Sequence, residues 1–180
     1  SGDYVFDNMS GIEWAATGVG TFSHTVTATA VTGTKAIYAY NGEIRATSSD
    51  RMPFDPSKLY RVTYRVWRHS STGASPGLIY LGLNCYDSTG SLITGGRLYA
   101  VKDAFAQESV PYRVWTEYVG YVKGLAAATG IEGTLLTPSP AINGTKSLGP
   151  YVLCNYQEIA GSPSRIHIDS VKIEEVAEEG

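Results

Sequence analysis

The sequence predicts an all-β protein built as a sandwich or a barrel. Segments in which apolar and polar residues alternate are separated at short intervals by turn-forming clusters, such as FDPS at 54–57 and DSTG at 87–90. Charged residues make up 17% of the chain, which also holds 20 Gly and 13 Tyr. Low charge with many Gly, Tyr, Thr and Val is typical of strands joined by tight turns, and no long amphipathic helical segment alternates with them.

The expected strands follow the chain between breakers such as GVG at 18–20, NG at 41–42 and PSPAING at 138–144. They lie near residues 3–7, 22–31, 35–40, 43–48, 58–69, 78–86, 97–102, 112–123, 148–156 and 165–175. A helical turn is expected at 103–109, and a second within 124–137, where glycines keep it short. Trp14, in SGIEWAATG, is expected in a loop that either caps a sugar or plugs the end of the sandwich.

A single β-sandwich domain is expected over residues 3–176, because no internal repeat or linker interrupts the chain. Ser1-Gly2 is typical of an affinity-tag remnant. Residues 177–180 are expected to be an acidic tail or the beginning of a linker.

Residues 58–69, KLYRVTYRVWRH, form the most informative segment. Tyr60, Val62, Tyr64 and Val66 alternate with a second face that holds Arg61, Thr63, Arg65, Trp67 and His69. This period of two predicts a half-buried strand whose Tyr and Val residues face the core. The opposite face then presents guanidinium groups, an indole and an imidazole to water, which is an unusual solvent face.

The segment at 78–86, LIYLGLNCY, alternates in the same way. Ile79, Leu81, Leu83 and Cys85 are expected to face the core, with Tyr80, Gly82, Asn84 and Tyr86 on the opposite side. Gly82 leaves a gap between bulky neighbours, which admits either a ligand or a neighbouring group. If the two strands are neighbours in one sheet, their outer faces form a groove.

Composition and motifs exclude several classes of function. The formal net charge of −3 gives no electrostatic basis for binding nucleic acid. No segment is long and apolar enough to insert in a membrane. The sequence has no zinc-ligand spacing, HExxH, GxSxG or phosphate-binding motif, so an enzyme is not expected. Cys85 and Cys154 lie in apolar segments and are expected to be buried thiols, with a disulfide as the alternative.

The longer pattern resembles a known family of domains. It consists of RMPFDPSKLYRVTYRVWR at 51–68, LIYLGLNCYDSTGSLI at 78–93, GTKSLGPYVLCNY at 144–156 and RIHIDSVKIEEV at 165–176. These segments resemble carbohydrate-binding-module jelly rolls, the galactose-binding-like sandwiches of families 4, 9 and 22, including those in bacteriophage tail-fibre and virion proteins. The resemblance implies an antiparallel jelly-roll β-sandwich over about 50–175. Gly149-Pro150 departs from an Arg-Pro pair that is frequent in such domains.

Glycan binding is the function that the residues and the resemblance both favour. A sugar ring stacks its C–H face on an aromatic side chain and presents hydroxyls to planar donors and acceptors. The predicted ligand-binding residues are Trp67, Tyr86, Tyr80, Arg65, Asn84 and Arg61. The alternative for Trp67 is that it covers the edge of the sandwich or packs beneath a loop.

The resemblance also implies a structural calcium ion and a structural tryptophan. Asp7 and Asp169 match the carboxylate positions that hold Ca²⁺ in many such sandwiches, and oxygen ligands suit calcium. The alternative is that both are exposed carboxylates. Trp115 matches a tryptophan that packs in the core. DSTGS at 87–91 is expected to be a turn and not a calcium loop.

The predicted protein is a non-catalytic glycan- or receptor-recognition domain of a phage tail fibre or virion protein. Its expected partner is a cell-surface or cell-wall glycan, and its expected location is the virion tail or the extracellular space. One predicted arrangement of the parent protein is a homotrimer. The alternatives are a purely structural domain of such a fibre and an accessory module of a secreted polysaccharide-degrading enzyme.

Overall fold

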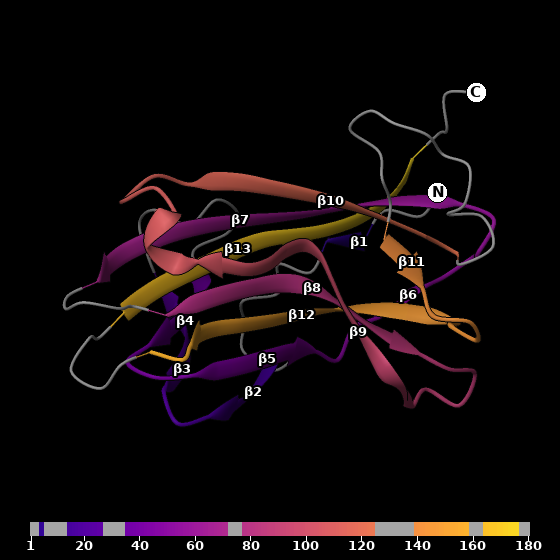
Figure 1. The fold of residues 1–180 in the computed structure, drawn as a ribbon, viewed down its shortest axis with the longest axis horizontal. Coiled ribbons are helices and arrows are strands. Elements are labelled where there is room, and N and C mark those ends of the chain that lie inside the picture. Colours follow the sequence, from indigo (N-terminus) through magenta and orange to yellow (C-terminus); the bar gives the residue numbers. More distant parts are fainter. Residues whose placement is uncertain are drawn as a thin grey trace.

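The computed structural model describes residues 4–5, 14–26, 35–71, 77–124, 139–158 and 164–176, which form two β-sheets packed face to face (Figure 1). One sheet, called here the β7 sheet, contains in spatial order β11 (Ser139–Ala141), β10 (Thr116–Gly124), β7 (Leu59–Ser71), β13 (Ser164–Val176), β4 (Lys35–Tyr40) and β3 (Thr21–Val26), with β1 (Tyr4–Val5) paired to β13. The other, the β8 sheet, contains β2 (Trp14–Gly18), β5 (Ile44–Ser48), β12 (Ser147–Tyr156), β8 (Leu78–Tyr86) and β9 (Leu92–Ala106), with β6 (Met52–Pro53) paired to β12.

The predicted antiparallel β-sandwich is confirmed. Every strand pair in the described residues is antiparallel except β10 with β11. Within these residues the helical content is one short 3-10 turn, η1 (Gln107–Ser109), so the turn expected at 103–109 is confirmed in its second half. No described helix is long and apolar enough to cross a membrane. Most of 124–137 lies outside the described residues.

The strand boundaries were predicted well in the middle of the sheets and poorly at the edges. β4 and β8 coincide with the expected 35–40 and 78–86, whereas β9 is longer than 97–102 and β10 begins at Thr116. The expectation that Trp14 lies in a loop is wrong: Trp14 begins β2 and is 3% exposed in the core. β2 is an edge strand with the sequence WAATG, so small residues hide its alternation.

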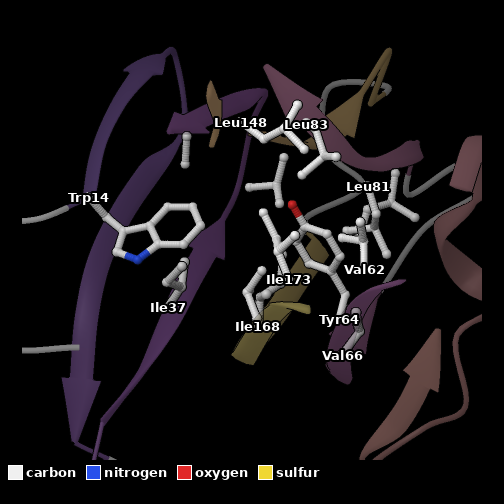
Figure 2. Packing of buried hydrophobic residues seen from close by; sticks show 14 of the residues in the cluster. Trp14, Ile37, Val62, Tyr64, Val66, Leu81, Leu83, Leu148, Ile168 and Ile173 are labelled. Atoms are coloured by element: carbon white, nitrogen blue, oxygen red, sulfur yellow. The ribbon is translucent and has the colours of Figure 1, made fainter. Parts of the chain in front are cut away.

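The predicted inner faces of the two long strands are confirmed. Tyr60, Val62, Tyr64 and Val66 on β7 are at most 2% exposed. Ile79, Leu81, Leu83 and Cys85 on β8 are completely buried. Figure 2 shows side chains of both sheets meeting in this core, with Tyr64 at its centre. Cys85 and Cys154 are buried free thiols, as expected, and burial raises the pKa of Cys154 to about 12.

Tyr64 connects the two sheets through its hydroxyl group. The phenol oxygen lies 2.5 Å from the carbonyl oxygen of Gly82 on β8 and 3.3 Å from that of Tyr151 on β12. Gly82 and Tyr151 face each other in the β8–β12 register. Burial raises the pKa of Tyr64, so the hydroxyl stays protonated and acts as a donor. The side chain of one sheet therefore supplies a hydrogen bond to the backbone of the other.

Pro150 occupies a central strand without leaving a partner unsatisfied. A proline cannot donate a backbone hydrogen bond and is normally confined to sheet edges. On one side β12 pairs with β6 at Ser147–Leu148 and with β5 at Tyr151–Cys154. Pro150 lies opposite the break between those two short strands, where no neighbouring strand is paired with it on that side.

The strand β9 closes one side of the sandwich, and two glycines make room for it. An added Cβ at Gly82 would meet the Leu98 carbonyl oxygen, and one at Gly120 would meet the Ala100 carbonyl oxygen, both far inside contact distance. β9 carries register shifts against β8 in this region, so its backbone bends between the two sheets. The gap that the sequence placed at Gly82 is therefore filled by the backbone of β9 and does not admit a ligand.

We expect Tyr64→Phe to lower the free energy of unfolding by about 1–2 kcal/mol, because two buried carbonyl oxygens lose their donor. The measurement is urea denaturation followed by fluorescence. Tyr118→Phe is the matched control, because Tyr118 packs its ring against Phe105 beside the core. Equal stability of the Tyr64→Phe variant and the parent would show that the hydroxyl does not hold the sheets together.

Candidate functional site

The six predicted ligand-binding residues lie on two opposite faces of the sandwich. Their strands, β7 and β8, belong to different sheets. Both strands turn their other face to the core, so the expected groove between their outer faces does not exist. The expectation of one continuous site is wrong for this reason. Arg61, Arg65 and Trp67 share the outer face of the β7 sheet, and Tyr80, Asn84 and Tyr86 belong to the β8 sheet.

On the β8 sheet, Asn84 and Tyr86 are occupied by contacts within the protein. They are 3% and 6% exposed, and the amide of Asn84 donates a hydrogen bond of 3.1 Å to the Tyr86 hydroxyl. The guanidinium of Arg51 lies 3.6 Å from the Tyr86 ring centroid and covers that ring. Neither side chain therefore offers a free stacking surface.

Tyr80 is half-buried beside two other tyrosines. Its ring centroid lies 4.7 Å from that of Tyr99 and 5.6 Å from that of Tyr156. The rings are tilted or perpendicular, which is the usual packing of aromatic side chains. This group lies on a different face from Trp67 and cannot contact the same sugar ring.

The outer face of the β7 sheet contains a hollow of about 600 Å³. The hollow lies over β10, β7 and β13, at the positions of the predicted residues Arg61 and Arg65. Its lining is Arg61, Thr63, Arg65, Glu117, Val119, Tyr121, Ser170, Lys172 and Glu174.

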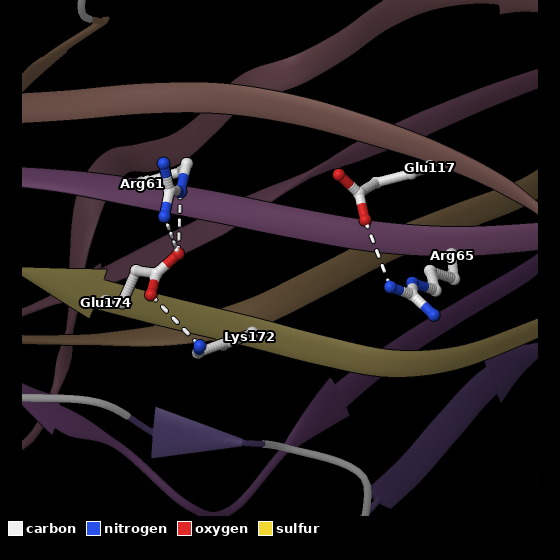
Figure 3. Close-up of polar contacts among 5 residues, drawn as sticks. All are labelled: Arg61, Arg65, Glu117, Lys172 and Glu174. Carbon is white, nitrogen blue, oxygen red and sulfur yellow. Dashed lines mark hydrogen bonds and ion pairs between the residues drawn. The ribbon is translucent and has the colours of Figure 1, made fainter. Parts of the chain in front are cut away.

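One half of the hollow is organised around the carboxylate of Glu174 (Figure 3). Oε1 accepts from the Arg61 guanidinium at 2.6 Å, and Oε2 lies 3.0 Å from Nζ of Lys172. Burial acts to raise the pKa of Glu174, but its bonds with Lys172 and Arg61 outweigh burial and hold the pKa below its ordinary value. The same bond with Glu174 raises the pKa of Arg61. Glu174 and Arg61 are therefore both charged at neutral pH.

The other half of the hollow holds the pair of Arg65 and Glu117. A nitrogen of the Arg65 guanidinium lies 3.2 Å from Oε2 of Glu117, and the two side chains are 41% and 50% exposed. The two residues face each other in the β7–β10 register. This pair is exposed to water and joined by a single contact, so it is easily opened.

Aromatic rings extend the outer face beyond the hollow. Trp67 stacks on Trp115 with ring centroids 5.9 Å apart and an angle of 25° between the planes. The Trp67 ring also lies 5.2 Å from His167, which lies 4.9 Å from Tyr38. We call Tyr38, His167, Trp67 and Trp115 the aromatic row. The expectation that Trp115 packs in the core is wrong, because it lies half-buried against Trp67 on this outer face.

His167 is the most buried member of the aromatic row. It is 4% exposed, and neither ring nitrogen has a hydrogen-bond partner in the described part of the chain. Burial, with a smaller contribution from nearby His69, lowers the pKa of His167 to about 4. Burial and the cations Arg165 and Arg113 lower the pKa of His69 as well. Both imidazoles are therefore neutral at neutral pH.

Of the two residues predicted to bind calcium, Asp169 is among the described residues. Asp169 on β13 is completely buried, and its Oδ1 accepts a backbone hydrogen bond of 2.7 Å from Ser170. Asp7 lies outside the described residues. Among the residues that are described, no three His, Cys, Asp or Glu gather where they could hold a metal ion. The DSTGS segment is a turn, as expected, because Oδ1 of Asp87 accepts from the backbone of Thr89 and Ser91.

Several residues of the hollow were not singled out by the sequence. Glu174 on β13 and Tyr121 on β10 lie opposite Arg61, and Glu117 on β10 lies opposite Arg65. Their partners follow from strand register, which a single sequence does not reveal. The one sequence signal that pointed to these residues was KIEEV at 172–176, where charged and apolar residues alternate as they do in β7.

The arrangement of these strands is found in solved structures of carbohydrate-binding modules. A xylan-binding domain of family CBM22 matches with a TM-score of 0.56 and 14% sequence identity, covering 100% of this chain and 99% of that one. The CBM22-1 xylan-binding domain of Paenibacillus barcinonensis Xyn10C matches with a TM-score of 0.53 and 13% identity, covering 98% and 94%. The fold is a carbohydrate-binding-module jelly roll. The identities are too low to transfer a ligand.

A phage protein shares the same fold. The enzymatically active domain of tailspike protein 4 from bacteriophage CBA120 matches with a TM-score of 0.53 and 10% identity over 95% of this chain. The match spans 20% of the tailspike chain. No family model and no curated protein sequence matches the chain.

We expect the stability of the protein to decrease as the pH falls from about 6.5 to about 4, the ordinary and the folded pKa of His167. Over this range the unfolded chain binds a proton that the folded protein excludes, so the free energy of unfolding falls by up to about 3 kcal/mol. His69 contributes with the same sign.

The measurement is urea denaturation at several pH values. His167→Phe keeps an aromatic ring and removes the titrating group, so its stability should change less over the same range. An equal pH dependence in this variant and the parent would show that His167 does not carry the effect.

Proposed function

We propose that this protein is a non-catalytic carbohydrate-binding module that holds a glycan on the outer face of the β7 sheet. One observation carries the proposal. The hollow, which is lined by hydrogen-bond donors and acceptors, and the indole of Trp67 lie next to each other along the same strand. Arg61, Thr63 and Arg65 line the hollow, and Trp67 is the next outward residue, about 7 Å further along β7.

The chemistry of this face suits a sugar chain. Guanidinium, ammonium and carboxylate groups around the hollow offer fixed donors and acceptors to hydroxyl groups. Val119 is 40% exposed, and the Trp67–Trp115 pair adds apolar surface for the C–H face of a sugar ring. The similar carbohydrate-binding modules support this proposal through their shared fold.

The proposed partner is a cell-surface or cell-wall glycan, and the proposed setting is a phage tail fibre, another virion protein or a secreted enzyme. The tailspike match and the xylan-binding matches support these settings through the fold. A single shallow site binds weakly, with a dissociation constant on the order of 10 μM to 1 mM. Several copies in a homotrimeric fibre would raise the effective concentration and allow firm attachment.

A structural calcium ion is a further part of the proposal, with Asp7 and Asp169 as ligands. The Asp169 carboxylate is completely buried, and carboxylate oxygens are hard ligands that suit calcium. β1 pairs with β13 at Lys172 and Ile173, which brings an N-terminal strand beside the segment that contains Asp169.

We expect EDTA to lower the melting temperature of the protein, because an ion that binds the folded state alone stabilises it. Elemental analysis should find calcium in the untreated protein, and Asp169→Asn should abolish the effect of EDTA. An identical melting curve with and without EDTA, together with no detectable metal, refutes this part of the proposal.

We expect Trp67→Ala to weaken glycan binding several-fold, since loss of stacking removes about 1 kcal/mol beyond the buried area. The experiment screens the protein on a glycan array and then titrates the strongest ligands by calorimetry. Tyr80→Ala is the matched control, because it removes a half-buried aromatic ring from the opposite sheet.

Arg65→Lys should also weaken binding, because a single ammonium group cannot replace a planar guanidinium fork. Full binding by the Trp67→Ala variant, or loss of binding in the Tyr80→Ala variant alone, would show that the glycan does not bind on the outer face of the β7 sheet. A complete absence of glycan binding would favour the purely structural domain.

A further inference from the structure

We infer that the hollow on the β7 sheet selects acidic glycans, whose sugars carry carboxylates, over neutral glycans of the same backbone. This inference rests on the proposed function and concerns the same site. It follows from the balance of charge in the hollow, from which of the charges reach water, and from how loosely the exposed pair is held.

The side chains that line the hollow carry a net positive formal charge on a protein that is acidic as a whole. Its lining contains three cations, Arg61, Arg65 and Lys172, against two carboxylates, Glu117 and Glu174. The difference is 3 − 2 = +1 within the hollow, whereas the whole chain has a formal charge of −3. A general attraction for polyanions is therefore weak, and a local attraction for a single carboxylate remains.

The cations of the hollow reach water, while its central carboxylate is covered. The Glu174 side chain is 13% exposed, compared with 40% for Arg61 and 37% for Lys172. Both oxygens of Glu174 already have a cationic partner, one from each neighbour. A ligand entering this half of the hollow thus meets two positive groups held in place by a carboxylate beneath them.

The exposed pair in the other half can exchange its partner. Arg65 contacts Glu117 at 3.2 Å through one nitrogen, and both side chains are well exposed. Such a pair contributes little to stability, and a ligand carboxylate can form two parallel hydrogen bonds with the guanidinium instead. Glu117 can turn into water at little cost because half of its side chain is already there.

The apolar groups around these cations favour a sugar over a simple anion. Val119 and Tyr121 line the hollow beside the charges, and Trp67 follows Arg65 on β7. Arg61 and Arg65 are four residues apart on one strand, which places their Cα atoms about 13 Å from each other. A ligand that contacts both must extend over more than one sugar ring, so the expected ligand is a chain that contains uronic acids.

The test compares pairs of oligosaccharides that share a backbone and differ in whether their sugars carry free carboxylates. Suitable pairs are oligogalacturonate with its methyl ester, glucuronic-acid-substituted xylo-oligosaccharide with the unsubstituted chain, and oligomannuronate with oligomannose. Calorimetry at neutral pH should show the acidic member binding about five-fold more tightly at low salt, in each pair that binds. High salt should remove most of this difference.

Variants of the hollow should change this preference in opposite directions. Lys172→Gln and Arg65→Gln should reduce the preference for the acidic member, and Glu117→Gln should increase it. Lys58→Gln is the matched control, because Lys58 pairs with Glu175 at 3.1 Å and does not line the hollow. Its preference should equal that of the parent.

The outcomes separate the two proposals. Equal or tighter binding of the neutral members overturns the acidic preference and leaves the carbohydrate-binding module intact. Absence of binding by every glycan overturns both proposals. Dextran sulfate is the control for unspecific polyanion binding: if it binds as tightly as the uronates, and Trp67→Ala weakens neither, the selection of sugar carboxylates is overturned.

Discussion

The hydrogen bond from Tyr64 into the opposite sheet fixes which face of β7 reaches water. Its hydroxyl meets the carbonyl oxygens of Gly82 and Tyr151 in the middle of the core, so Tyr64 cannot turn outward without losing a buried donor. Side chains of a strand alternate with a period of two, and a slip of one residue would exchange its two faces. The position of Tyr64 therefore places Arg61, Arg65 and Trp67 together on the outside, where the hollow and the aromatic row lie.

The sequence allowed the faces of the strands to be predicted, but not the sheet to which each strand belongs. Alternation is a local property, and it identified the core-facing positions in the centre of β7 and β8, but it did not show that Asn84 and Tyr86 on the other face of β8 are buried as well. Membership of a sheet depends on pairing between distant segments. Asn41-Gly42 is an example: this dipeptide often joins two strands of one hairpin, yet here it connects β4 of one sheet to β5 of the other. For the same reason, the sequence did not show that the six predicted binding residues lie on two opposite faces.

The residues of the hollow that the sequence did not predict lie on strands paired with β7. Their positions depend on strand register, which is also a non-local property. Arg61 was predicted from its own strand, but Glu174 and Tyr121, which face it, come from β13 and β10. A chain with 17 acidic residues gives no reason to select Glu174 before its position opposite Arg61 is known. Trp115 illustrates the same point. The resemblance to carbohydrate-binding modules implied a core tryptophan, and its contact with Trp67 on the outer face depends on how β10 approaches β7.

Stability does not account for the charges that surround the hollow. Exposed ion pairs contribute about 1 kcal/mol or less, and the Arg65–Glu117 pair has a single contact between two well-exposed side chains. The Glu174 carboxylate is covered, so two cations are needed to offset its burial. Uncharged Thr and Val side chains at these positions would satisfy a sheet surface as well or better. The arrangement instead holds cations at the surface of a concave site, beside an indole that follows on the same strand. That combination has a physical reason if the face binds a polar, flat and negatively charged ligand.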